Sequence, residues 1–274
     1  MTGAPWTWWT ASDGVPIPKF CGKEGAMRPI ADYHTHTRWS HASGNIADNL
    51  RAAAELGLEA IGIAEHGPNL LFVGVPRRRW PRLERAVREA GGPGKPRLLF
   101  NIEANVISLE GDLDIPPPLV DRLDMLLVGL HPRVAPSGMD ACWAFYGLRW
   151  LALLSRRHRH LLYDSFTRAL INCVQRHKVD ILVHPGYGLP IDSRELARAC
   201  ARRGTRLEIN CRHADTCAPD IQRAAAVEEV EFVIGSDAHA PGEVGRFERG
   251  IELVRRLGLD RERIVNVNWK DKGR

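Results

Sequence analysis

Short apolar runs and amphipathic segments alternate along the chain from residue 29 onward. The apolar runs are typical of buried strands and lie at 29–31, 59–64, 97–102, 124–130, 180–183, 206–210 and 231–236. Helical patterns separate them at 46–56, 81–90, 138–178, 193–203, 219–230 and 245–257. Pro81 is expected in the first turn of its helix, a further helix is expected to begin at Pro219, and Ser193 is a predicted N-cap. The order predicts an α/β fold of seven βα units with parallel strands, a TIM-like barrel in one domain.

Residues 1–28 differ from the barrel domain, which we place at 29–274. They contain three closely spaced tryptophans and several prolines, a pattern that predicts an extended arm. Such an arm packs on the domain, contacts a second copy of the chain, or caps the mouth of the site. The connection at 138–178 is longer than a minimal crossover. Its aromatic residues predict packing on the barrel or, alternatively, a lid or dimer surface.

Side chains that bind metals follow six of the seven predicted strands. His34 and His36 are two apart, so on a strand both point to one face. A lone pair of this kind is weak evidence for a metal, but further candidates follow it: His41, His66, Glu103, His131, His184, Asp237 and His239. The carboxyl ends of barrel strands meet on one face. We therefore expect nine ligand-type residues to converge in one cleft, with only the sixth strand, which ends at Asn210, Cys211 and Arg212, lacking one.

Nine such residues are too many for a single ion, because one ion takes three or four protein ligands and water. The sequence therefore predicts two or three divalent ions. Imidazole and carboxylate ligands suit zinc, manganese or iron.

Composition bears on the substrate, the redox state of the cysteines and the localisation of the protein. The net charge of +5 and the pI near 9.0 suit an anionic substrate without indicating nucleic acid. The six cysteines show no Cys-x-x-Cys pair, which favours reduced thiols. We find neither an apolar run of about 18 residues nor the features of a signal peptide. We therefore expect a cytoplasmic protein with no membrane partner, and a homo-oligomer stays open.

Seven short motifs occur along the chain, in this order: His34-Thr35-His36, Ala64-Glu65-His66-Gly67-Pro68, Asn101-Ile102-Glu103-Ala104-Asn105, Gly129-Leu130-His131, Val183-His184-Pro185-Gly186, Leu207-Glu208-Ile209-Asn210 and Gly235-Ser236-Asp237-Ala238-His239. With these motifs, residues 29–268 resemble the PHP (polymerase and histidinol phosphatase) family, above all its stand-alone bacterial phosphatases. The resemblance implies a distorted (βα)7 barrel with a trinuclear metal site. One ion would be held by His34, His36, Glu103 and Asp237. Glu103 would bridge to a second ion on His131 and His184, and the third would lie on His41, His66 and His239.

The predicted activity is metal-dependent hydrolysis of a small phosphate monoester. A metal-bound hydroxide would be the nucleophile, because metal charge lowers the pKa of bound water. The catalytic residues are expected to be His34, His36, Glu103 and Asp237. Arginine suits phosphate, so Arg212, Arg133 and Arg38 are candidates for holding the substrate.

Three alternatives stay open. A phosphodiesterase or nuclease would use the same metals, but the basic clusters lie in separate helical segments, so nucleic acid is possible but not favoured. A metallo-amidohydrolase is disfavoured by Glu103 on the third strand and by the lack of a clear bridging lysine after the fourth. A non-catalytic PHP module would be expected to have lost ligands, and none of the nine is missing.

Overall fold

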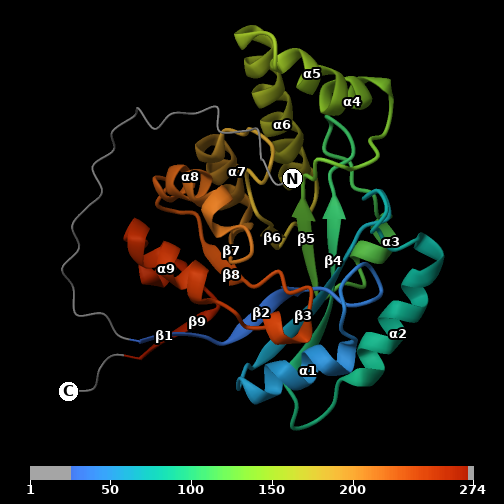
Figure 1. Cartoon of the computed structure of the whole chain (residues 1–274), viewed down its shortest axis with the longest axis vertical. Helices are drawn as coiled ribbons and strands as arrows, with labels where there is room; N and C mark the ends of the chain where they lie inside the picture. The colour runs from blue at the N-terminus through green and yellow to red at the C-terminus, as the bar shows by residue number, and fades with distance from the viewer. Residues whose placement is uncertain (1–25, 271–274) are drawn as a thin grey trace.

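A computed structural model describes residues 26–270 (Figure 1). Within this range, seven parallel strands form one sheet in chain order. They are β2 (Ala31–Thr35), β3 (Ala60–His66), β4 (Arg97–Asn105), β5 (Met125–Gly129), β6 (Ile181–Leu182), β7 (Arg206–Asn210) and β8 (Phe232–Gly235). The sheet curls until β2 meets β8, where Thr35 and Ala238 form a bridge and the His36 N–H donates to the Ala238 carbonyl. The predicted seven-stranded barrel is confirmed as a nearly closed one.

Helices follow the strands and cover the outside of the barrel (Figure 1). The longer ones are α1 (Ile46–Glu55), α2 (Trp80–Ala90), α6 (Arg156–Arg176), α7 (Ser193–Arg203), α8 (Ala214–Ala225) and α9 (Glu248–Leu257), with a short α3 (Pro117–Val120) and 3₁₀ turns at Arg77–Arg79, Pro241–Glu243 and Arg261–Arg263. Asn45 and Asp48 cap the start of α1 reciprocally, through the side chain of each and the backbone N–H of the other. Gly204 ends α7 in the left-handed region, at φ 68°.

Two predicted helix starts were wrong. Helix α8 begins at Ala214, not at Pro219, and the proline lies inside the helix. The Asn210 side chain accepts from the His213 N–H, and this contact starts the helix before the proline. A preference of proline for the first turn does not take such a contact into account. Asp192, not Ser193, is the N-cap of α7, because its carboxylate accepts from the N–H groups of residues 194 and 195.

The connection at 138–178 forms a helical insert beyond the carboxyl ends of β4 and β5 (Figure 1). One arm consists of α4 (Met139–Cys142), a π-helical turn (Trp143–Gly147) and α5 (Leu148–Ala152), and α6 forms the other. The inner side of the first arm is buried against the barrel through Ala144, Phe145 and Leu148. The predicted packing of this insert on the barrel is therefore present, although its outer side is not covered.

Asn266 links the first and last strands of the barrel. Its buried Nδ2 donates to the carbonyls of Ala31 in β2 and Ile234 in β8, at 2.9 and 2.8 Å, and its Oδ1 accepts from the Ile234 N–H. Outside the barrel, β1 (Ala26–Pro29) pairs antiparallel with β9 (Val267–Lys270). Residues 26–28, which we had assigned to the arm, thus belong to a strand. The tryptophans of the predicted arm lie outside the described residues.

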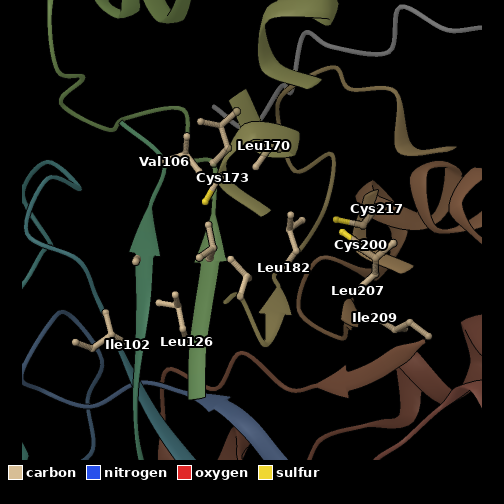
Figure 2. Close-up of a cluster of buried hydrophobic side chains, with 14 of the residues drawn as sticks. Ile102, Val106, Leu126, Leu170, Cys173, Leu182, Cys200, Leu207, Ile209 and Cys217 are labelled. Carbon is tan, nitrogen blue, oxygen red and sulfur yellow. The ribbon is translucent and has the colours of Figure 1, made fainter. Parts of the chain in front are cut away.

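The core has two parts. The larger part fills the space between strands and helices, where strand residues such as Leu126 and Leu182 belong to one cluster with Cys173 of α6 (Figure 2). A smaller cluster is formed by residues in or directly after four strands, β3, β5, β6 and β8: Ala64, Leu127, Ile181, Val183 and Val233. The five described cysteines are free thiols. A packed barrel of this kind gives a rigid support for side chains at the strand ends.

Candidate metal centre

Four of the predicted ligands meet at the carboxyl ends of β2, β4 and β8. His34 Nε2 lies 3.1 Å from His36 Nε2 and 3.4 Å from Glu103 Oε2. Asp237 Oδ1 lies 3.7 Å from His34 Nε2 and 3.4 Å from His36 Nε2. Donor atoms around one tetrahedral ion with bonds of about 2.1 Å stand about 3.4 Å apart. The four side chains therefore have the spacing of a single metal site.

Glu103 connects this group to a second one. Its Oε2 faces the first group, while its Oε1 lies 3.0 Å from His131 Nε2 and 2.8 Å from His184 Nε2. The carboxylate is completely buried. Its two oxygens thus point to two different ligand sets, the arrangement expected of a carboxylate that bridges two ions.

A third group of imidazoles lies beside the first. The His66 ring is 4.3 Å from the His36 ring, and the His239 ring is 4.5 Å from it, between centroids. The His41 ring is 4.4 Å from His239 and 5.1 Å from His66. His41 is the one exposed member, so this group is the most open of the three. The structure thus brings all nine predicted ligands together.

Two outer hydrogen bonds hold predicted ligands in place, through partners to which the sequence assigned no role. Glu208 Oε1 lies 2.7 Å from His34 Nδ1, and Asn105 Oδ1 lies 2.7 Å from His131 Nδ1. Each bond occupies Nδ1 and leaves Nε2 facing the ligand group. Glu208 lies between two apolar residues of a buried strand, and a buried carboxylate needs a partner. This carboxylate within an apolar strand was the signal from which a role for Glu208 could have been predicted.

Two ligands have a strained backbone. His184 and Asp237 are in the left-handed region, with φ of 30° and 55°. Non-glycine residues seldom adopt this conformation, and where they do it frequently serves a functional site. The Glu208 Oε2 atom accepts from the His184 N–H at 2.9 Å and helps to hold this turn.

The charges of the group are set by burial and by neighbours. Burial opposes ionisation of Glu103, but His66, His131 and His34 outweigh it and hold its pKa well below the ordinary value. Asp237 is likewise held ionised, with a lowered pKa, by His34 and His36 against the effect of burial. Burial and the neighbouring His66 lower the pKa of His36, which is therefore neutral near pH 7. Carboxylates and a neutral imidazole are the forms that bind metals.

Some of these nitrogen and oxygen atoms are buried without a hydrogen-bond partner in the described part of the chain, which also fits metal binding. Within residues 26–270, His36 Nδ1, His66 Nδ1 and Glu103 Oε2 are buried without a hydrogen-bond partner. His66 Nδ1 and Glu103 Oε2 are only 2.5 Å apart, but their geometry makes no hydrogen bond. Buried polar atoms normally have partners, and a cation would provide one here.

The three predicted substrate arginines are placed unequally. Arg212 lies near the centre, because it pairs at 3.0 Å with Glu243, which also accepts from the His239 N–H. Arg133 and Arg38 are exposed on the loops that follow β5 and β2. Sequence reasoning left out His213, whose Nε2 lies 3.5 Å from Asp237 Oδ2 and whose ring stacks on Tyr187 at 3.8 Å.

Comparison with known proteins identifies the family of the chain. Residues 32–182 match the family model described as the PHP domain. The chain belongs to the PHP family. A probable phosphatase from Shewanella piezotolerans is 31% identical over 88% of this chain and 90% of its own length. Another from Caldanaerobacter subterraneus subsp. tengcongensis is 29% identical over 88% of this chain and 89% of its own length.

A solved structure shares the fold of this PHP protein. Histidinol phosphate phosphatase from Lactococcus lactis, crystallised with zinc, L-histidinol and phosphate, aligns over 85% of this chain and 95% of its own with a TM-score of 0.52. The sequence identity is 14%, so the likeness concerns the barrel alone. Among the described residues, no helix is long and apolar enough to span a membrane.

Proposed function

We propose that this PHP protein is a metal-dependent phosphomonoesterase with a trinuclear centre. The observation that carries the proposal is the position of Glu103, whose two oxygens face two ligand groups with a third group of imidazoles beside them. The relatives named as probable phosphatases support phosphate-ester hydrolysis at this site. The cofactors would be two or three divalent ions of zinc, manganese or iron.

Each group of the protein has a task in this reaction. Bound metal ions would lower the pKa of water and offset the negative charge of the phosphoryl group. His34, His36, Glu103 and Asp237 would hold the first ion, His131 and His184 the second together with Glu103, and His41, His66 and His239 the third. Arg212, kept beside His239 by Glu243, would bind phosphoryl oxygens, whereas Arg133 and Arg38 would act from the exposed loops.

The structure favours a small monoester over a nucleic acid. The basic cluster at 77–79 is engaged in holding the fold: Arg77 donates to the Asp114 carbonyl, and Arg79 donates to the Trp39 carbonyl and lies 4.8 Å above the Trp39 ring. These arginines are therefore not arranged as a free track for a phosphate backbone. The ligands are also recessed, because His34, His36 and Glu103 are at most 1% exposed.

Elemental analysis combined with a substrate screen tests the proposal. We expect two to three metal ions per chain, and turnover of phosphomonoesters when zinc, manganese or iron is supplied. Diester cleavage without monoester turnover would replace the proposal by the nuclease alternative. A folded, metal-loaded protein that hydrolyses no ester would support a non-catalytic module.

Variants of the first group separate the role of the metals from stability. Glu103→Ala and His36→Ala are expected to abolish turnover while the fold, followed by circular dichroism, survives. Glu231→Ala is a matched control, because its carboxylate is exposed and, within residues 26–270, its ion pair is with Arg206 at the other end of the strands. Parental activity in either ligand variant, with metal content verified, would contradict the assigned roles.

A further inference from the structure

The outer side of the helical insert is apolar, where a surface helix normally carries polar residues. The exposed fractions are 90% for Met139, 56% for Trp143, 73% for Trp150 and 82% for Leu154. These residues are spaced by four, seven and four positions, so they form one stripe along the first arm of the insert and the turn that follows it. A stripe of large apolar side chains in water is a mark of an interaction surface.

The charges beside the Leu154 end of this stripe are positive. From residue 141 to residue 163 the chain has four arginines, two histidines and no aspartate or glutamate, and the one acidic neighbour of the stripe is Asp140, at its Met139 end. Arg156 and Arg157 are exposed at the start of α6, directly after the turn that carries Leu154. Tryptophan and leucine flanked by arginine are typical of surfaces that enter the headgroup region of anionic bilayers.

The insert stands at the end of the barrel where the candidate centre opens. It is anchored to the segment after β5, because the Tyr146 hydroxyl donates to the Val134 carbonyl at 2.6 Å. The loop after β3 is anchored to the same segment, because the Leu71 N–H donates to the Arg133 carbonyl. That loop carries Phe72, which is 97% exposed and has a strained φ of 71°. Strain that holds an aromatic ring in water points to a contact outside the protein.

We propose that the insert surface, formed by Met139, Trp143, Trp150, Leu154, Arg156 and Arg157, docks on an anionic phospholipid bilayer, with Phe72 as a second contact. The protein would lie on the membrane rather than cross it, and the metal centre would open toward the lipid surface. No membrane partner was expected from the sequence, because it lacks a spanning run, but a docked surface needs none.

Two other occupants fit this surface less well. A two-fold contact with a second copy pairs the patch with itself, and within residues 139–157 the only carboxylate it offers to Arg156 and Arg157 is that of Asp140. A nucleic acid would satisfy the arginines but offers no apolar layer for Leu154 and Met139. An anionic bilayer satisfies both parts of the surface.

Vesicle flotation of the full chain tests the proposal. We expect binding to phosphatidylcholine vesicles that contain phosphatidylglycerol, weak binding to phosphatidylcholine alone, and loss of binding in about 0.5 M salt. The double variants Trp150→Ser/Leu154→Ser and Arg156→Gln/Arg157→Gln should each weaken binding about tenfold or more. Leu56→Ser is the matched control, because Leu56 is 51% exposed at the end of α1, on the opposite end of the barrel.

Several results would overturn this inference. Equal binding to neutral and anionic vesicles would show that the arginines do not select an anionic bilayer. Parental binding by folded double variants would place the contact elsewhere, for example in residues 1–25. Self-association in sedimentation that Trp150→Ser/Leu154→Ser abolishes, without vesicle binding, would identify a second copy as the partner. The assay needs neither metal nor turnover, so its outcome is independent of the proposed function.

Discussion

Glu208 Oε1 lies 2.7 Å from Nδ1 of His34, and both side chains are buried at the carboxyl end of the barrel. When His34 is neutral, this bond keeps its proton on Nδ1 and directs the lone pair of Nε2 toward His36, Glu103 and Asp237. The other oxygen of Glu208 accepts from the Asn210 side chain at 2.9 Å. One buried carboxylate thus orients a ligand of the proposed first metal ion.

Glu208→Gln should therefore weaken metal binding, although Glu208 is not itself one of the predicted metal ligands. We expect a loss of about 10-fold to 100-fold in zinc affinity or turnover, the usual effect of removing such a partner. Competition with a chelating dye measures the affinity, and thermal unfolding checks the fold. Glu231→Gln, at an exposed carboxylate, should change neither. Equal affinity of the Glu208→Gln and parental proteins would assign the bond a purely structural role.

Gly235→Ala tests the contact between Glu208 and His34, because Gly235 lies in β8, next to the strand that carries Glu208. A Cβ at this position would stand 2.1 Å from Glu208 Oε1, so the carboxylate must move away from His34. Turnover should fall at least tenfold, since small displacements of catalytic groups have large effects on rate. Gly242→Ala, where an added Cβ meets nothing within 4 Å, is the control. Unchanged turnover with Gly235→Ala would show that the His34–Glu208 bond is dispensable.

The barrel and its ligands were predictable because they depend on local patterns. Buried parallel strands are short apolar runs. The end of each run locates the carboxyl end of a strand, and with it the residues that lie there. His34 and His36 follow from the alternation of a strand. The division of Glu103 between two ligand groups came only with the resemblance to the PHP family, because spacing does not show which oxygen faces which neighbour.

The remaining features depend on contacts between distant residues. Glu208 and His34 are 174 positions apart, and Asn105 and His131 are 26 apart, so no local pattern pairs them. The early start of α8 likewise follows from a side chain in the preceding strand. The pairing of Arg212 with Glu243 beside His239 needed the closed barrel.

Metal binding should release protons near neutral pH. Burial opposes the charge of His34, but Glu208, Asp237 and Glu103 raise its pKa well above the ordinary value, so the metal-free imidazole carries a proton. The pKa of His184 is also raised, mainly by Glu103 against burial. A metal binds neutral imidazole, so each proton must leave. Affinity should therefore fall as the pH drops from about 8 to 6.

Calorimetric titration with zinc in buffers of different ionisation enthalpy measures this release. At least one proton per chain is expected near pH 7, from His34, and the raised pKa of His184 adds to the release. Glu208→Gln removes the negative charge that raises the pKa of His34, so this variant should release fewer protons. Zinc binding that is independent of both buffer and pH would be incompatible with the protonated histidines.

Asn266→Ala should destabilise the barrel by opening the junction of β2 and β8. The side chain satisfies the Ala31 carbonyl and both backbone groups of Ile234, and it is completely buried. Its removal leaves buried backbone groups without partners at a cost of about 2 kcal/mol or more. Urea unfolding of the metal-free protein measures the change. Asn268→Ala, at an exposed residue two positions on, should cost little. Equal stability of the two variants would show that the Thr35–Ala238 bridge closes the barrel without Asn266.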